Sequence, residues 1–239
     1  MIAQTRAIAM PMKRYACLLA IPLLSCATAQ AARPFVTDDA RMVDAGGCQL
    51  ETFAKRQKLV DEREFWLLPA CNPWGGVELT LGGTRVEGSV PGNSRTTILQ
   101  AKTLIKTLQT NGTGYALTLG MLQTQPYRRA RADSFYVNAI ASASYADDRV
   151  VLHANLGAID DRAAGMRRAT WGVGAEIALG SRLYGIAESY GQHGEKPTMH
   201  VGLRVWLVPN RVQVDGTLGH QQSGPPERRF QSVGLRVLF

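Results

Sequence analysis

The stretch VGLRVLF at positions 233–239, which ends the sequence, decides the fold. Apolar side chains take every second position of this stretch, namely Val233, Leu235, Val237 and Phe239. Gly234 and Arg236 lie among the positions between them. Because successive side chains of a strand point to opposite faces, the stretch predicts a β-strand with one apolar and one polar face.

The same alternation recurs upstream, and no amphipathic helix of convincing length follows residue 31. It predicts twelve strands, near 48–57, 63–71, 76–86, 95–107, 113–123, 134–145, 149–158, 167–179, 181–191, 197–208, 211–220 and 228–239. Each is close to the length with which a tilted strand crosses a bilayer. We therefore expect an all-β, antiparallel transmembrane barrel of about twelve strands, with ten as the alternative count.

Every second connection is short and built from turn-forming residues, such as Asn72-Pro73-Trp74-Gly75, Thr110-Asn111-Gly112 and Pro209-Asn210. The connections between them are mostly longer and more polar. Short turns at one end and long loops at the other are typical of outer-membrane barrels, where they are periplasmic and extracellular respectively. A soluble β-sandwich is the alternative, but it is not expected to sort its loops in this way.

The two faces of a strand can also be assigned. The positions Ala169, Trp171, Val173, Ala175, Ile177 and Leu179 make one apolar side, and Thr170, Gly172, Gly174 and Glu176 make the other. The strand near 197–208 divides in the same way, with Arg204 on its polar side. A basic residue facing lipid near the midplane costs about 2–4 kcal/mol, so the apolar sides are predicted to face lipid and the polar sides the lumen.

The amino-terminal region predicts export. Lys13 and Arg14 precede a short apolar run at 16–24, and small residues follow at 27–32, so residues 1–31 are interpreted as a signal peptide cleaved after Ala31 or Ala29. A loose lipobox ending at Cys26 leaves lipidation as the alternative. Residues 32–47 are expected to form a periplasmic lead-in and residues 48–239 the barrel. Removing residues 1–31 removes three cations and no acid, so the net charge of +8 becomes +5.

Two cysteines remain after cleavage, Cys48 and Cys71. Exported chains tend to pair their cysteines, and these two fall nearly opposite each other in the first hairpin. We expect a disulfide there. A metal site or reactive thiol is the alternative, although no histidine is nearby in the sequence.

Charged residues recur on the predicted lumenal face: Glu51, Lys55, Glu78, Lys102, Lys106, Glu176, Glu188, Arg204, Asp215 and Arg236. We call these ten residues the charge belt. Buried charges persist when they are paired, so the belt is interpreted first as a structural network that fills a narrow lumen. It could also be a constriction that selects small polar solutes, as charge rings do in pores.

Catalytic and cofactor signals are weak. His153 and the neighbouring Ser142 and Ser144 could form a Ser–His pair, but the His-x-Ser spacing of outer-membrane phospholipases is absent, so an ordinary lumenal hydrogen bond is favoured. No histidines have metal-binding spacing, no Gly-rich stretch opens a helix, and no cofactor is predicted. The loop arginines 128, 129 and 131 could meet lipopolysaccharide phosphates or simply be solvated.

Three motifs carry a resemblance to a known family: RPFVTDDA at 33–40, QAKT at 100–103, and the terminal Phe239. They resemble a group of proteobacterial outer-membrane proteins loosely grouped with the meta-pathway phenol-degradation family, often described as transporters. The resemblance implies a barrel that admits small, even aromatic, compounds, and it defines no catalytic residue. This chain is shorter than typical members, which affects the expected pore width.

The leading functional hypothesis is a passive outer-membrane channel or transporter for small solutes, with a narrow lumen of mixed charge. A lipid-modifying hydrolase and a closed structural or interaction barrel are the alternatives. The expected partners are outer-membrane lipid and lipopolysaccharide, the barrel-assembly machinery through the last strand and Phe239, and a small solute. No basic patch interleaved with aromatic residues predicts nucleic acid.

Overall fold

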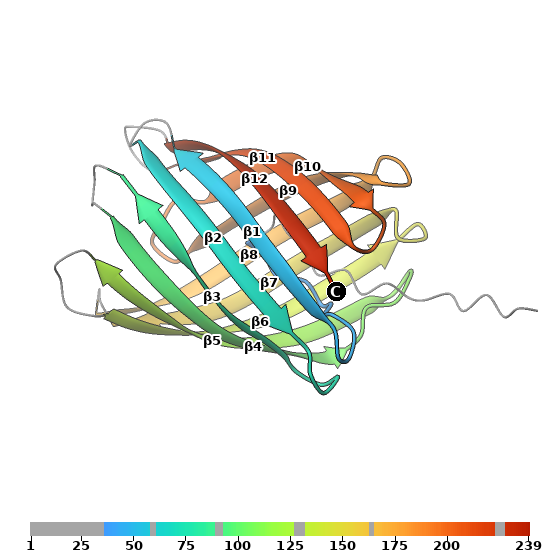
Figure 1. Ribbon diagram of the computed structural model, residues 1–239, viewed down its shortest axis with the longest axis horizontal. Coiled ribbons are helices and arrows are strands. Elements are labelled where there is room, and N and C mark those ends of the chain that lie inside the picture. The colour runs from blue at the N-terminus through green and yellow to red at the C-terminus, as the bar shows by residue number, and fades with distance from the viewer. Residues whose placement is uncertain (1–35, 58–60, 89–92, 127–131, 163–164, 223–227) are drawn as a thin grey trace, which may run out of the picture.

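The computed structural model of the chain describes residues 36–57, 61–88, 93–126, 132–162, 165–222 and 228–239. They form a closed antiparallel barrel in which each strand pairs with its neighbours in sequence and the first strand pairs with the last (Figure 1). The strands are β1 Cys48–Gln57, β2 Glu62–Cys71, β3 Glu78–Glu87, β4 Ser94–Lys106, β5 Thr113–Pro126, β6 Ala132–Tyr145, β7 Val150–Asp161, β8 Met166–Ala178, β9 Leu183–Gln192, β10 Thr198–Val208, β11 Val212–Gln221 and β12 Arg228–Leu238. The predicted count of twelve is confirmed, while the predicted signal peptide lies outside the described residues.

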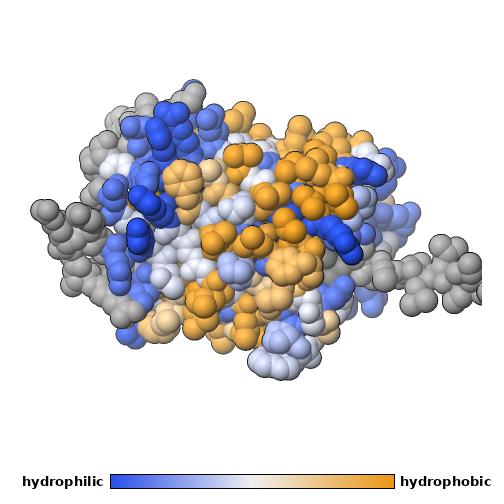
Figure 2. Space-filling view, viewed as in Figure 1, coloured by the Kyte–Doolittle hydropathy of each residue, from blue (hydrophilic) through white to orange (hydrophobic). Residues whose placement is uncertain are grey.

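The outer wall of the barrel is apolar, as the alternation predicts. On β10, Val201 is 60%, Leu203 52% and Leu207 54% exposed, whereas Arg204 between them is 1% exposed. Apolar side chains form a band across the middle of the face shown in Figure 2. Exposed apolar area of this extent is unusual for a protein surrounded by water. No helix long and apolar enough to span a bilayer occurs among the described residues.

Tight turns connect the strands at one end of the barrel. Their backbone enters the left-handed region at Asn111 (φ 54°), at Ala146, Asp147 and Asp148 (φ 52°, 57° and 63°) and at Asn210 (φ 57°). Asn and Asp tolerate this region better than other side chains, which explains their place in these turns. The carboxyl terminus lies at this end too (Figure 1), and we call it the turn end, and the opposite one the loop end.

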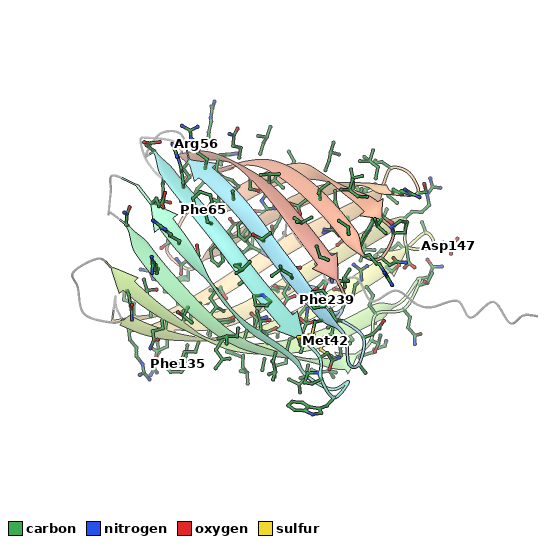
Figure 3. All side chains as sticks on the ribbon, viewed as in Figure 1. Met42, Arg56, Phe65, Phe135, Asp147 and Phe239 are labelled. Atoms are coloured by element: carbon green, nitrogen blue, oxygen red, sulfur yellow. A yellow bond between two sulfur atoms is a disulfide. The ribbon has the colours of Figure 1, made fainter. Side chains whose placement is uncertain are left out.

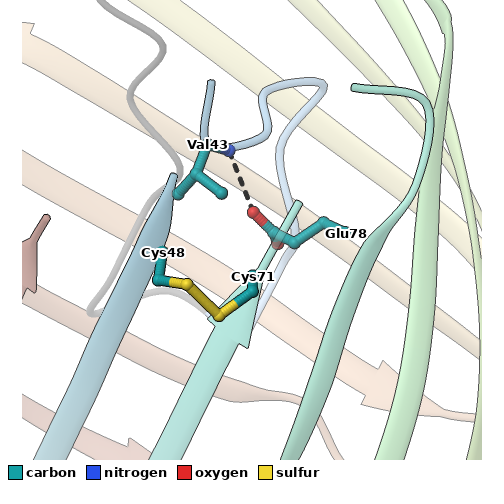
Figure 4. The surroundings of a disulfide bond; sticks show 4 residues. All are labelled: Val43, Cys48, Cys71 and Glu78. Atoms are coloured by element: carbon teal, nitrogen blue, oxygen red, sulfur yellow. Dashed lines mark hydrogen bonds between the residues drawn. A yellow bond between two sulfur atoms is a disulfide. The ribbon is translucent and has the colours of Figure 1, made fainter. Parts of the chain in front are cut away.

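A disulfide joins the first two strands at the turn end (Figure 4). Cys48 and Cys71 are directly opposite each other in the β1–β2 register, with Cα atoms 4.1 Å apart. The predicted pairing of these cysteines is confirmed. The bridge lies where the chain leaves the barrel interior and enters β1.

The interior of the barrel is polar and partly filled. Residues 36–47, expected to form part of a periplasmic lead-in, instead run inside the barrel, where Thr37, Asp39 and Ala40 are 2%, 0% and 0% exposed. A small apolar cluster of Ala40, Ala116 and Ile140, with Leu104 against it, packs part of this segment to the wall. We call residues 36–47 the lumenal segment.

Candidate functional site

The lumenal segment is held by its backbone. The amides of Val36 and Thr37 both donate to the Glu188 carboxylate of β9, the first over 3.0 Å. Asp38 and Asn155 of β7 exchange two hydrogen bonds, of 2.6 and 2.8 Å. Backbone donors that find partners inside the barrel avoid the cost of unsatisfied buried amides. The segment is therefore bound by directional contacts rather than loosely enclosed.

Later residues of the lumenal segment also donate backbone hydrogen bonds to side chains of the barrel wall. The Ala40 amide donates to Ser142 Oγ of β6 over 2.9 Å. The Val43 amide donates to Glu78 Oε2 of β3 over 2.9 Å, as Figure 4 shows beside the disulfide. Contacts from β3, β6, β7 and β9 thus surround the segment. The belt carboxylates Glu78 and Glu188 serve as acceptors for it.

Ion pairs also hold the lumenal segment in place. Lys102 of β4 is 2% exposed, and its Nζ lies 2.6 Å from Asp38 Oδ1 and 3.3 Å from Asp39 Oδ1. Arg41 Nη1 lies 3.5 Å from both Asp39 Oδ2 and Glu176 Oε1. Burial lowers the pKa of Arg41, but attraction to Glu176 and Asp39 outweighs it and raises the pKa above its ordinary value. Arg41 is therefore a permanent cation.

One glycine makes room for the segment. A Cβ atom at Gly172 of β8 would lie 2.3 Å from Thr37 Oγ1, which is closer than any real contact. Glycine at this position is thus explained by the close approach of Thr37.

Most of the charge belt lies where the sequence predicts it. Seven of its residues are at most 5% exposed: Glu78, Lys102, Glu176, Glu188, Arg204, Asp215 and Arg236. Arg204 pairs with Glu176 at 3.1 Å, Arg236 with Glu51 at 3.5 Å, and Lys55 with Glu64 at 2.7 Å. The low exposure and close pairing of these charges agree with the interpretation of the belt as a structural network that fills a narrow lumen.

Lys106 is the exception, because it is exposed on the outside. The β4–β5 register shifts between Leu104 and Lys106, so that Lys106 pairs with the outward Tyr115. A β-bulge inserts one residue and reverses the faces beyond it. The prediction that Lys106 faces the lumen is therefore wrong.

Ser142 and His153 do form a pair. Ser142 Oγ lies 2.8 Å from His153 Nδ1, and His153 Nε2 lies 3.2 Å from Glu176 Oε1. Ser142 and His153 are only 2% and 3% exposed, and the Ser142 hydroxyl already accepts the hydrogen bond from Ala40. The pair faces the lumen beneath the segment, where a membrane lipid has no access. This arrangement supports the lumenal hydrogen bond that the sequence favours.

Open space remains beside the segment. One cavity of about 350 Å³ is lined by segment residues Val36 and Asp38 and by wall residues that include Phe53, Trp66 and Tyr136. A second, of about 390 Å³, lies among β5 to β11 and shares Val36 and Tyr136 with the first. Figure 3 shows side chains pointing to both sides of the ribbon, with Met42 at the turn end. The lumen is thus narrowed rather than filled.

The first cavity has an aromatic wall. The rings of Phe53 and Trp66 stack with centroids 5.2 Å apart and an interplanar angle of 9°. Trp66 Nε1 donates to Glu64 Oε2 over 3.0 Å, and Tyr136 donates to Gln100 Oε1 over 2.6 Å. Flat apolar surface beside amide and hydroxyl groups suits small polar molecules that have an apolar face.

Sequence reasoning missed the role of Asp38, Asp39 and Arg41. One signal for it exists in the register. Glu188 is opposite Gly174 and His200, and Glu176 is opposite Val151 and Ile186, so neither carboxylate has a lysine or arginine beside it on a neighbouring strand. Buried carboxylates in that position require donors from elsewhere. For Glu176 they come from Arg204 of β10 and from Arg41 of the lumenal segment, and for Glu188 the segment amides of Val36 and Thr37 add to His200, which lies 2.6 Å away.

Comparisons with known proteins agree with this architecture. A family model described as "Uncharacterised conserved protein UCP029691" matches residues 19–239. No curated protein matches the sequence significantly. Among solved structures, the KdgM porin in complex with disordered oligogalacturonate is similar with a TM-score of 0.60 at 12% identity, covering 80% of this chain and 99% of its own. The NanC porin is similar with a TM-score of 0.56 at 10% identity, covering 79% and 98%.

Proposed function

The chain belongs to the UCP029691 family, and we propose that it is an outer-membrane channel that passes small neutral or cationic solutes beside its lumenal segment. The observation that carries the proposal is the pair of cavities in a polar lumen inside an apolar outer wall. Contact with lipid accounts for the apolar side chains of the outer wall, and contact with water accounts for the polar side chains of the lumen. The fold shared with the KdgM and NanC porins supports the same reading.

The charge of the lumen favours some solutes over others. Lys55, Lys102, Arg204 and Arg236 each lie within 4 Å of a carboxylate, which limits what they offer to an anion. The carboxylates of the segment and the belt outnumber the cations even when Arg41 is included, since Asp38 and Asp39 add to the five belt acids. An acidic oligosaccharide such as the one in the KdgM structure is therefore a poorer fit than a neutral or cationic solute.

The aromatic side chains of the first cavity narrow the class of expected solutes further. Phe53, Trp66 and Tyr136 offer flat apolar surface to one side of a solute, and Gln100 and Thr118 offer polar groups in the same cavity. Small rings that carry hydroxyl or amine groups match this lining. The aromatic solutes implied by the family resemblance fall in this class.

A conductance measurement tests the proposal. The refolded protein is expected to conduct in planar bilayers. Under a KCl gradient, the sign of its reversal potential is expected to show a preference for cations. Glu51→Gln, which removes a carboxylate from the first cavity, is expected to reduce the cation preference. Glu87→Gln, near the rim of the outer wall, is the matched control and should leave it unchanged. Absence of conductance together with absence of solute entry into proteoliposomes would support the closed barrel instead.

The proposal also covers assembly of the barrel in the outer membrane, through Phe239. The Phe239 amide donates to the Cys48 carbonyl over 2.9 Å, while its ring is largely exposed at 74%. An exposed terminal aromatic beside the β1–β12 seam is suited to recognition by the barrel-assembly machinery. Phe239→Ser is expected to lower the amount of barrel in the outer membrane without changing the conductance of barrels that do form.

A further inference from the structure

Five arginines follow one another around the loop end of the outer wall. They are Arg229 of β12, Arg56 of β1, Arg63 of β2, Arg85 of β3 and Arg95 of β4, and we call them the arginine row. Arg56 is directly opposite Arg63 and Arg85 is directly opposite Arg95, and all five are exposed. Hydrophilic side chains gather at the loop end of the face in Figure 2, and Arg56 lies there in Figure 3.

The row carries an excess of positive charge. Glu87 lies 2.8 Å from Arg85, and Asp61 lies 3.8 Å from Arg56, whereas Arg63 and Arg95 have no carboxylate within 4 Å among the described residues. The opposite wall differs, because there Asp160 lies within 4 Å of both Arg162 and Arg167, so that each of these two arginines has a carboxylate partner. An unbalanced arginine row beside an apolar surface favours an anionic ligand.

An apolar groove of about 1020 Å³ lies directly beside the row. One line of residues in register across β10, β11, β12, β1 and β2 alternates large and small side chains: Leu203, Gly216, Val233, Ala54 and Phe65. Because Gly216 and Ala54 are small, the wall is hollowed between the larger neighbours. Arg56 and Arg63 line the same groove at its polar end, and Figure 3 shows Arg56 close to Phe65.

We propose that this groove and the arginine row bind one phosphorylated, multiply acylated lipid, the chemistry of the lipid A part of lipopolysaccharide. Guanidinium groups bind phosphate oxygens in pairs, and an acyl chain fills the apolar hollow below them. The sequence predicts that the longer connections lie at the loop end, so we assign this end to the outer leaflet, where lipopolysaccharide is found. The two sites that such a lipid needs, one that binds its phosphate groups and one that holds an acyl chain, thus occur together on one wall.

Native mass spectrometry of the full-length mature protein tests this site. The probes are bisphosphorylated lipid A, its dephosphorylated form and phosphatidylglycerol. Wild type is expected to retain lipid A, and Arg56→Gln/Arg63→Gln is expected to lower retention at least tenfold. The pair Arg162→Gln/Arg167→Gln, on the opposite wall, removes the same charge and should retain lipid A like the wild type.

A second variant tests the chain site alone. The nearest atom to a Cβ at Gly216 is the Ser232 carbonyl oxygen at 3.8 Å, so Gly216→Leu fills the groove without disturbing the backbone. It is expected to weaken lipid A binding while heat-modifiable migration on gels, a measure of folding, stays unchanged. Equal loss in both arginine pairs, or full retention in Arg56→Gln/Arg63→Gln, would overturn the site. Equal binding of phosphatidylglycerol would show a general lipid surface and also overturn it.

Discussion

Lys102 Nζ lies 2.6 Å from Asp38 Oδ1, and this contact joins the middle of β4 to a segment that is 64 residues earlier in the chain. The same nitrogen also reaches Asp39, so one buried lysine holds two consecutive carboxylates. Thr118 of β5 adds a hydrogen bond to the other oxygen of Asp38 over 3.2 Å. The position of the lumenal segment therefore depends strongly on this lysine.

Lys102→Met is expected to destabilise the barrel and widen the conducting path. It leaves the buried Asp39 and the half-buried Asp38 without their main cation, which costs about 3 kcal/mol. The change is measured as a lower urea midpoint by tryptophan fluorescence and as a larger single-channel conductance. Lys106→Met, on the same strand but exposed, is the matched control and should change neither. If both variants behave like the wild type, the lysine does not hold the segment.

Gly172→Ala is expected to lower stability by about 1–3 kcal/mol, because its methyl group overlaps Thr37. Thr37→Ala in the same chain removes Oγ1 and should recover most of the loss. A double-mutant cycle of urea midpoints measures this coupling. Additive effects of the two substitutions would contradict the contact.

Val173→Arg tests whether lipid surrounds the outer wall. Val173 is 51% exposed in the middle of β8, so an arginine there is expected to cost about 2–4 kcal/mol in lipid. Met166→Arg, 44% exposed at the loop end of the same strand, is expected to cost about 0–1 kcal/mol. Refolding into vesicles at increasing urea measures both. Equal effects at the two depths would indicate that water, not hydrocarbon, touches this surface.

Reduction of the Cys48–Cys71 bridge is expected to destabilise the protein by about 3 kcal/mol, since the bridge closes a loop between residues 23 apart. Non-reducing and reducing gels should differ in mobility, and the urea midpoint should fall after treatment with dithiothreitol. Cys48→Ala/Cys71→Ala should have the lower midpoint with and without the reductant. Conductance is expected to persist in the reduced protein, because both cysteines lie at the turn end.

The strands could be predicted because two different solvents act on them. An apolar outside and a polar inside impose strict alternation on each strand, and this periodicity is visible in a single sequence. The bulge near Lys106 could not be seen, because one inserted residue leaves the composition of β4 unchanged while it reverses the face.

The lumenal segment could not be predicted for a different reason. Its backbone follows no repeat, and its partners are distant in the chain: Ala40 and Ser142 are 102 residues apart, and Thr37 and Glu188 are 151 apart. Periodicity reports local structure and says nothing about such contacts. The belt residues other than Lys106 were identifiable as inward, but the groups that they bind were not.

The seam between β1 and β12 has a consequence for biogenesis. The lumenal segment runs directly into Cys48, and the Cys48 amide bonds to the Phe239 carbonyl on the far side of that seam. Arg236 of β12, 0% exposed, also donates to Gln49 of β1 over 2.8 Å. Joining the two ends of the sheet therefore encloses whatever the cylinder contains at that moment. We therefore expect the lumenal segment to be in place when β1 pairs with β12, because a segment left outside would have to enter through an open end of the finished barrel.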